Sequence, residues 1–172
     1  MDSLTWWQRV KADPSAFAGW LQDQYRGERG AAERIERLRD QFAGTARARR
    51  VLTVIAGQER RHAQWIGELL VARGIPLEST KADRYWRRTL PGITDLATGA
   101  AVGAHAERMR LERIEVIVAD ESAPGDVREV FRRILPEERF HARAFAALAT
   151  PETLEATRGA HELGRIALGL SP

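Results

Sequence analysis

The chain has 172 residues, of which 44% are hydrophobic, so we expect a single domain (1–172) with a substantial core. It contains no cysteine, which excludes disulfides, thiolate metal sites, iron–sulfur clusters and a cysteine nucleophile, so any metal must be held by oxygen and nitrogen ligands. The formal charge is only +3 because 27 basic residues nearly balance 24 acidic ones, and no basic block is interleaved with aromatic residues as a nucleic-acid groove requires.

The start of the chain carries no sign of export or membrane insertion. Residues 1–7 lack a basic region followed by an apolar run, and no stretch approaches the roughly 20 apolar residues that span a bilayer. We therefore expect a soluble, cytoplasmic protein with no transmembrane segment and no nucleic-acid partner.

The first half of the chain predicts two long helices joined by a tight turn. Apolar residues recur at helical spacing, and strand-like alternation is missing. The first helix is expected to begin at Ser15, a suitable N-cap, and to end near Phe42. Glu28 falls on its apolar stripe, whereas Glu33 faces away. The second helix stops near residues 74–76.

The second half repeats this arrangement after a crossover. Residues 75–92 give mixed signals and fit a long connection. A third helix from Ile93 and a fourth helix capped by Asp126 follow, with Pro136 expected to bend the fourth. Proline at the first position then starts a fifth helix over about 151–169.

The two halves read as an internal duplication of residues 15–74 and 93–149. Each copy holds a glutamate followed by a Glu-x-x-His motif, and corresponding residues of the two copies are 79 positions apart. These residues are Glu28, Glu59 and His62 in the first copy and Glu107, Glu138 and His141 in the second. The predicted fold is all-α, with a four-helix bundle built from a doubled hairpin and a C-terminal fifth helix.

Helical geometry selects these six residues as partners. In an antiparallel hairpin, residues equidistant from the turn lie at the same height. The midpoint of positions 28 and 59 falls at 43–44, and that of 107 and 138 falls at 122–123, which are the two predicted turns. Each glutamate then lies roughly 23 Å from its turn, level with its partner. Pairs starting at Glu33 or Glu112 would miss the midpoint and lie on the polar stripe.

The residue types predict a site for two divalent cations. Glutamate and histidine three residues apart share one helix face, so each pair can reach the bundle interior. Four buried carboxylates would be too costly unless two cations compensated them. Oxygen ligands with one imidazole per metal suit iron, with manganese as the alternative, and argue against a closed structural zinc site.

Other candidates are less specific. Tyr25 lies one turn before Glu28, where it can hydrogen-bond a ligand or metal-bound water, and ordinary core packing is an equal alternative. His105 and His161 have no carboxylate at a matching height and are expected to be solvated or bonded to other groups. Several glycines near the two single glutamates either leave room for a substrate or allow close packing, with packing slightly favoured; they are Gly27, Gly30, Gly99 and Gly103.

The order Glu, Glu-x-x-His, Glu, Glu-x-x-His over about residues 15–149 resembles the ferritin-like di-iron carboxylate superfamily, which includes rubrerythrins, bacterioferritins, manganese catalases and di-iron hydroxylases. The string Gly-Glu-Arg-Gly-Ala at 27–31 is also similar to a motif of demethoxyubiquinone hydroxylases. There are departures. A rubredoxin module needs cysteine, which this chain lacks. Bacterioferritins have a haem-ligand methionine beside the second-helix motif, and no methionine lies there in this chain. Arg110 stands where rubrerythrins have a further acidic residue. The crossover lacks the apolar stretch expected for a quinone hydroxylase.

The resemblance implies an oxidoreductase that activates O2 or peroxide at a pair of irons, with small-molecule hydroxylation as the first choice. It implies terminal or bridging roles for Glu28 and Glu107, bridging roles for Glu59 and Glu138, and one imidazole per metal from His62 and His141. Electrons would come from an external donor, since the chain has no nucleotide-binding fingerprint. The alternatives are ferroxidase and iron storage, a rubrerythrin-like peroxidase and a metal-free interaction module. A monomer or homodimer is expected for the oxidoreductase, whereas storage would need a large cage of subunits.

Overall fold

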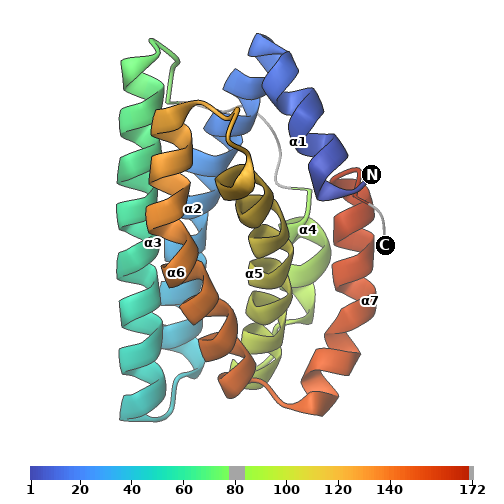
Figure 1. Ribbon diagram of the computed structural model, residues 1–172. Coiled ribbons are helices and arrows are strands. Elements are labelled where there is room, and N and C mark those ends of the chain that lie inside the picture. The colour runs from blue at the N-terminus through green and yellow to red at the C-terminus, as the bar shows by residue number, and fades with distance from the viewer. Residues whose placement is uncertain (78–83, 171–172) are drawn as a thin grey trace.

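The computed structural model describes residues 1–77 and 84–170, which form helices and contain no strand (Figure 1). The predicted all-α class is confirmed. The elements are α1 (Ser3–Ala12), α2 (Pro14–Phe42), α3 (Ala46–Ala72), α4 (Trp86–Thr89), the 3-10 helix η1 (Leu90–Gly92), α5 (Leu96–Ala119), α6 (Gly125–Leu148) and α7 (Pro151–Ala167). None of these helices is both long enough and apolar enough to cross a membrane.

Four long helices form the bundle, as the duplication predicts. α2 packs along α3 and α5 packs along α6, and the two hairpins meet mainly through α3 and α6. α7 lies against α4 and α5, and α1 crosses one end of the bundle over α2 and α5 (Figure 1). The two turns fall at 43–45 and 120–124, where the sequence places them. The connection between α3 and α5 contains α4 and η1, and residues 78–83 of the expected crossover lie outside the described residues.

The helix starts differ from expectation in three places. Asp13, and not Ser15, caps α2, because its carboxylate accepts the backbone N–H groups of residues 15 and 16 at 2.8 and 3.1 Å. α5 starts three residues later than expected and is capped by Asp95. α6 starts after Pro124 without a side-chain cap, and Asp126 instead pairs at 2.7 Å with Arg73, the C-cap residue of α3. The expected start of α7 is confirmed, with Thr150 as its cap.

Two apolar cores are separated by a polar layer. One core lies at the end of the bundle that α1 covers (the α1-end core), and the other lies at the end with the α2–α3 turn (the turn-end core). Each draws residues from all four bundle helices. The larger members of the α1-end core are Trp7, Trp20, Leu21, Ile66, Ile114, Phe131 and Ile134. Those of the turn-end core are Ile35, Leu38, Leu52, Ile55 and Phe145. Every bundle helix therefore passes from one core to the other, and its residues between the two cores form the layer in which the predicted ligands lie.

Candidate metal centre

All six predicted side chains converge in this polar layer. Five of them are 0% exposed, and Glu107 is 7% exposed. Their ligand atoms form two groups, in each of which the atoms lie within 4.8 Å of one another. The first group is Glu28, Glu59, His62 and Glu138, and the second is Glu59, Glu107, Glu138 and His141. Glu59 and Glu138 belong to both groups, so they lie where bridging ligands would lie between two cations.

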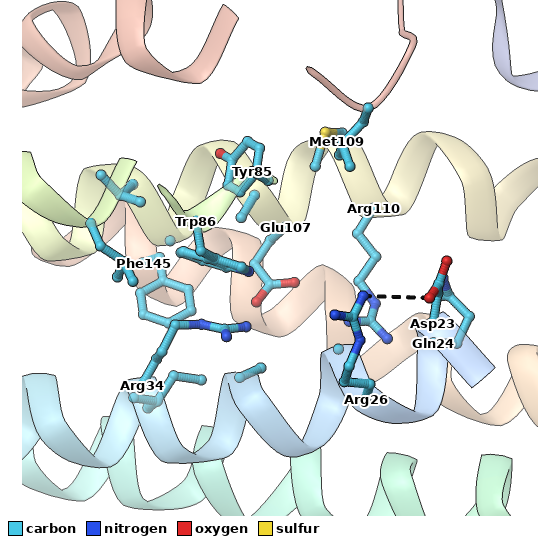
Figure 2. Close-up of a pocket in the computed structure, with 18 of the residues that line it drawn as sticks. Asp23, Gln24, Arg26, Arg34, Tyr85, Trp86, Glu107, Met109, Arg110 and Phe145 are labelled. Atoms are coloured by element: carbon cyan, nitrogen blue, oxygen red, sulfur yellow. Dashed lines mark hydrogen bonds and ion pairs between the residues drawn. The ribbon is translucent and has the colours of Figure 1, made fainter. Parts of the chain in front are cut away.

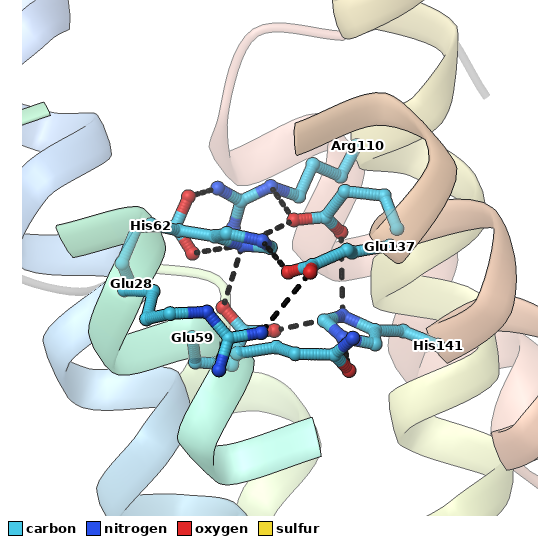
Figure 3. A network of polar contacts seen from close by, with 9 residues as sticks. Glu28, Glu59, His62, Arg110, Glu137 and His141 are labelled. Carbon is cyan, nitrogen blue, oxygen red and sulfur yellow. Dashed lines mark hydrogen bonds and ion pairs between the residues drawn. The ribbon is translucent and has the colours of Figure 1, made fainter. Parts of the chain in front are cut away.

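Each imidazole turns one nitrogen towards the carboxylates and the other towards the opposite hairpin (Figure 3). His62 Nδ1 lies 3.2 Å from Glu138 Oε1, and its Nε2 donates to Glu137 Oε2 at 2.8 Å. His141 Nδ1 lies 3.2 Å from Glu59 Oε1, and its Nε2 donates to Gln58 Oε1 at 3.0 Å. With Nε2 carrying a proton, Nδ1 is the nitrogen that can bind a metal.

The two residues that orient the imidazoles, Gln58 and Glu137, are related by the same duplication and were missed in the sequence. Each directly precedes a Glu-x-x-His glutamate and bonds the histidine of the other hairpin. Gln58 and Glu137 occupy equivalent positions in the two repeats, so the duplication could have identified them from the sequence. Their chemistry differs, because His62 is held by a carboxylate and His141 by a neutral amide.

Most of the ligand atoms that point into the layer lack a hydrogen-bond partner. Both carboxylate oxygens of Glu28, Glu59 and Glu138 are buried without a hydrogen bond, and so is Nδ1 of each histidine. Buried acceptors in this state are strongly destabilising unless a cation compensates them. A set of oxygen and nitrogen donors without sulfur suits iron or manganese, so these residues fit a pair of such ions.

Arg110 also belongs to this site, which the sequence indicated only as a departure from the rubrerythrin pattern. It lies one turn after Glu107 on α5, and its guanidinium pairs with Glu28 while Nε lies 3.2 Å from Glu138 Oε1 (Figure 3). Its positive charge therefore offsets part of the negative charge in the first ligand group.

Burial and charge shift the pKa values of the carboxyl groups in opposite directions. Burial, together with the nearby Glu138, raises the pKa of Glu59 and raises that of Glu107 further. Burial also acts on Glu138, but the charge of Arg110, together with the adjacent His62 and Glu107, lowers its pKa below the ordinary value. Protons therefore bind Glu59 and Glu107 more tightly than an ordinary glutamate, and a cation bound at the centre would compete with them.

The remaining candidates belong to neither ligand group. Tyr25 packs its ring against Gly67 of α3, with the Arg29 guanidinium 5.8 Å from the ring centroid. His105 stacks on His161 at 4.7 Å. The expectation that these histidines are bonded elsewhere agrees with the structure, because His161 Nδ1 lies 2.8 Å from the Tyr85 hydroxyl and His105 donates to a backbone carbonyl of α7.

The glycines near the centre serve two purposes. The ring of Phe145 covers Gly103, and Leu38 covers Gly99, so a Cβ at either position would collide with a side chain. These two glycines allow close packing, as favoured from the sequence. A Cβ added at Gly27, next to Glu28, would meet nothing within 4 Å, so this position does leave room.

The asymmetry between the two imidazole partners leads to a first prediction. Glu137→Gln keeps a hydrogen-bond acceptor for His62 but removes the negative charge, which makes the imidazole a weaker ligand. We expect about a tenfold loss of affinity for the metal that His62 would hold and little change for the other. Calorimetric titration of the metal-free protein with Mn(II) would resolve the two steps. Gln58→Glu is the matched variant and should strengthen the step at His141. Equal changes at both steps would contradict the assignment.

Comparison with known proteins agrees with this geometry. Residues 20–149 match the model of the Rubrerythrin family, and the chain belongs to that family, within the ferritin-like di-iron carboxylate superfamily. Neither a curated protein nor a solved structure matches the chain. The match covers α2 from residue 20, the whole of α3, α5 and α6, and the six residues of the centre.

Proposed function

We propose that this member of the Rubrerythrin family is a di-iron oxidoreductase that uses O2 or peroxide to oxidise a small molecule. Glu28 and His62 would hold one iron, Glu107 and His141 the other, and Glu59 and Glu138 would bridge them. The bound irons would supply the redox chemistry, with manganese as the alternative metal. Electrons would come from an external donor.

The observation that carries this proposal is a cavity of about 720 Å3 between α2 and α5, with Glu107 in its wall (Figure 2). This volume is typical of small-molecule sites. Iron storage needs a route for iron and an enclosing shell of subunits, whereas oxidation of an organic molecule needs room for that molecule beside the metals. A substrate in this cavity would lie against the Glu107 side of the centre.

The chain's own residues would prepare the centre for this reaction. Gln58 and Glu137 fix the orientation of the two imidazoles, since each accepts the Nε2 proton of one histidine. The two apolar cores exclude water above and below the ligands, which strengthens every charge interaction inside the layer. Arg110 holds Glu28 and Glu138 through its guanidinium.

The test is iron stoichiometry together with particle size. We expect Fe(II) supplied in excess under air to saturate at two irons per chain, oxidised by O2 or peroxide, in a monomer or dimer. The reason is that the bundle has ligands for two ions and the proposal needs no mineral chamber. Sedimentation and elemental analysis of one preparation measure both quantities. A cage of many subunits filled with mineral would establish storage instead.

A further inference from the structure

The cavity is long, and the candidate metal centre lies near its middle. Its wall follows one face of α5 from Gly99 to Ile117, which at helical rise is roughly 27 Å. The facing wall is α2. Glu107 lies between the two ends, so a molecule along this axis would extend past the metals in both directions (Figure 2).

The two ends of the cavity differ in chemistry. The end towards the α2–α3 turn is mainly apolar, with Leu38, Phe42, Ile93 and Phe145 in its wall beside Arg37 and Gln41. The other end has Trp6 and Trp20 in its wall together with the charged side chain of Arg113. A ligand that fits both ends would be apolar along most of its length and polar at one end.

Positive charge dominates the polar side chains of the wall. Five arginines line the cavity against two carboxylates, Asp23 and Glu107, and the latter is a candidate metal ligand. The arginines are Arg26, Arg34, Arg37, Arg110 and Arg113. Figure 2 shows the Arg26, Arg34 and Arg110 side chains in the cavity, with Asp23 and Arg26 paired at 3.4 Å. The polar end of the ligand should therefore be an anion.

Arg113 is the arginine best suited to hold that anion. Its guanidinium carbon lies 4.4 Å from the centroid of the Trp6 ring, and its Nε is buried without a hydrogen-bond partner. Burial lowers its pKa to about 10, which still leaves it charged at neutral pH. Within the described part of the chain it forms no ion pair, whereas Arg110 is paired with Glu28 and Glu138. A desolvated cation of this kind gains most from a bound carboxylate.

We propose that the cavity binds an apolar carboxylic acid, with the carboxylate on Arg113 and the apolar body running past Glu107 towards Phe145. The inference rests on the proposed function, whose substrate class it names. Arg113 follows Glu107 by six residues on α5, so the carbon beside the metals would lie about 9 Å from the carboxylate along the helix axis.

Binding of simple probes to the iron-loaded protein tests the inference. Decanoate, 1-decanol and decylamine share one apolar chain and differ in head group. We expect decanoate to bind at least tenfold more tightly than decanol, and decylamine more weakly than either. Arg113→Gln should remove the preference for decanoate and leave the affinity for decanol unchanged. Arg108→Gln is the control, because Arg108 lies exposed on the same helix outside this cavity.

A second variant tests the location without touching a charge. Gly27 lines the cavity with open space around it, so Gly27→Leu should fill the space, lower the affinity for both decanoate and decanol, and leave two irons bound. Gly159→Leu, at an exposed and equally open position of α7, should change neither. Equal affinity for decanoate and decanol, or an unchanged preference in Arg113→Gln, would overturn the inference. Loss of the two-iron stoichiometry with decanoate binding intact would instead count against the proposed function.

Discussion

Alanine at either Glu59 or Glu138 is expected to reduce the metal content from two ions per chain to nearly none. Both carboxylates belong to both ligand groups, so removing one takes a ligand from each ion and leaves three side chains for each. Glu28 belongs to one group only, and Glu28→Ala should therefore retain about one ion. Elemental analysis after dialysis against excess Fe(II) without air, followed by desalting, measures the content.

Two controls separate loss of a ligand from loss of the fold. Glu33 lies exposed on α2, five residues after Glu28, so Glu33→Ala should keep both ions. Glu59→Ala and Glu138→Ala should melt cooperatively without metal, with Glu59→Ala above the unmodified metal-free protein, because it removes a buried carboxylate that lacks a partner. Equal loss of metal in Glu33→Ala and Glu59→Ala would contradict the assignment of the six residues.

Metal binding is expected to raise the melting temperature strongly, by an amount that grows with pH. A ligand at 1,000 times its Kd adds about 4 kcal/mol to the free energy of unfolding for each site, which for a chain of this size is roughly 10 °C or more.

Burial raises the pKa of Glu59 and Glu107 above the ordinary 4.5. A raised pKa in the fold favours the protonated state, so the contribution of these groups to the stability of the metal-free protein is present below 4.5 and lost as pH rises through the raised pKa.

A bound metal is expected to reverse this pH dependence of stability, because it binds the ionised carboxylates and displaces their protons. The difference in melting temperature between metal-loaded and chelator-treated protein should therefore be small near pH 4.5 and increase towards neutral pH. Calorimetric scans of both forms across this range measure it. The Glu59→Ala variant should show almost no difference at any pH. A metal effect independent of pH would contradict displacement of protons from these two carboxyl groups.

The sequence could predict much of the bundle because the relevant signals are periodic and local. Glu28 and Glu107 lie on apolar stripes, and their distances to the predicted turns match those of Glu59 and Glu138. The duplication repeats this pattern, and the structure brings the same six side chains together. Helix starts were less predictable, because Asp13 and Ser15 are both good caps and the spacing of apolar residues does not choose between them; Asp13 as the cap leaves Pro14 at the first helical position.

The sequence by itself determined the α-helical class, the paired hairpins and the residues available to bind two cations, since a fixed rise and a fixed angle per residue convert spacing into height and direction. Only the tertiary structure decided how the facing helices meet. The rotation of α3 against α6 brings Gln58 to His141 and Glu137 to His62. The separation of α2 from α5 leaves the cavity open and lets Arg110 reach Glu28. Such contacts depend on packing between segments far apart in the chain, for which the spacing of residues within one helix carries no information.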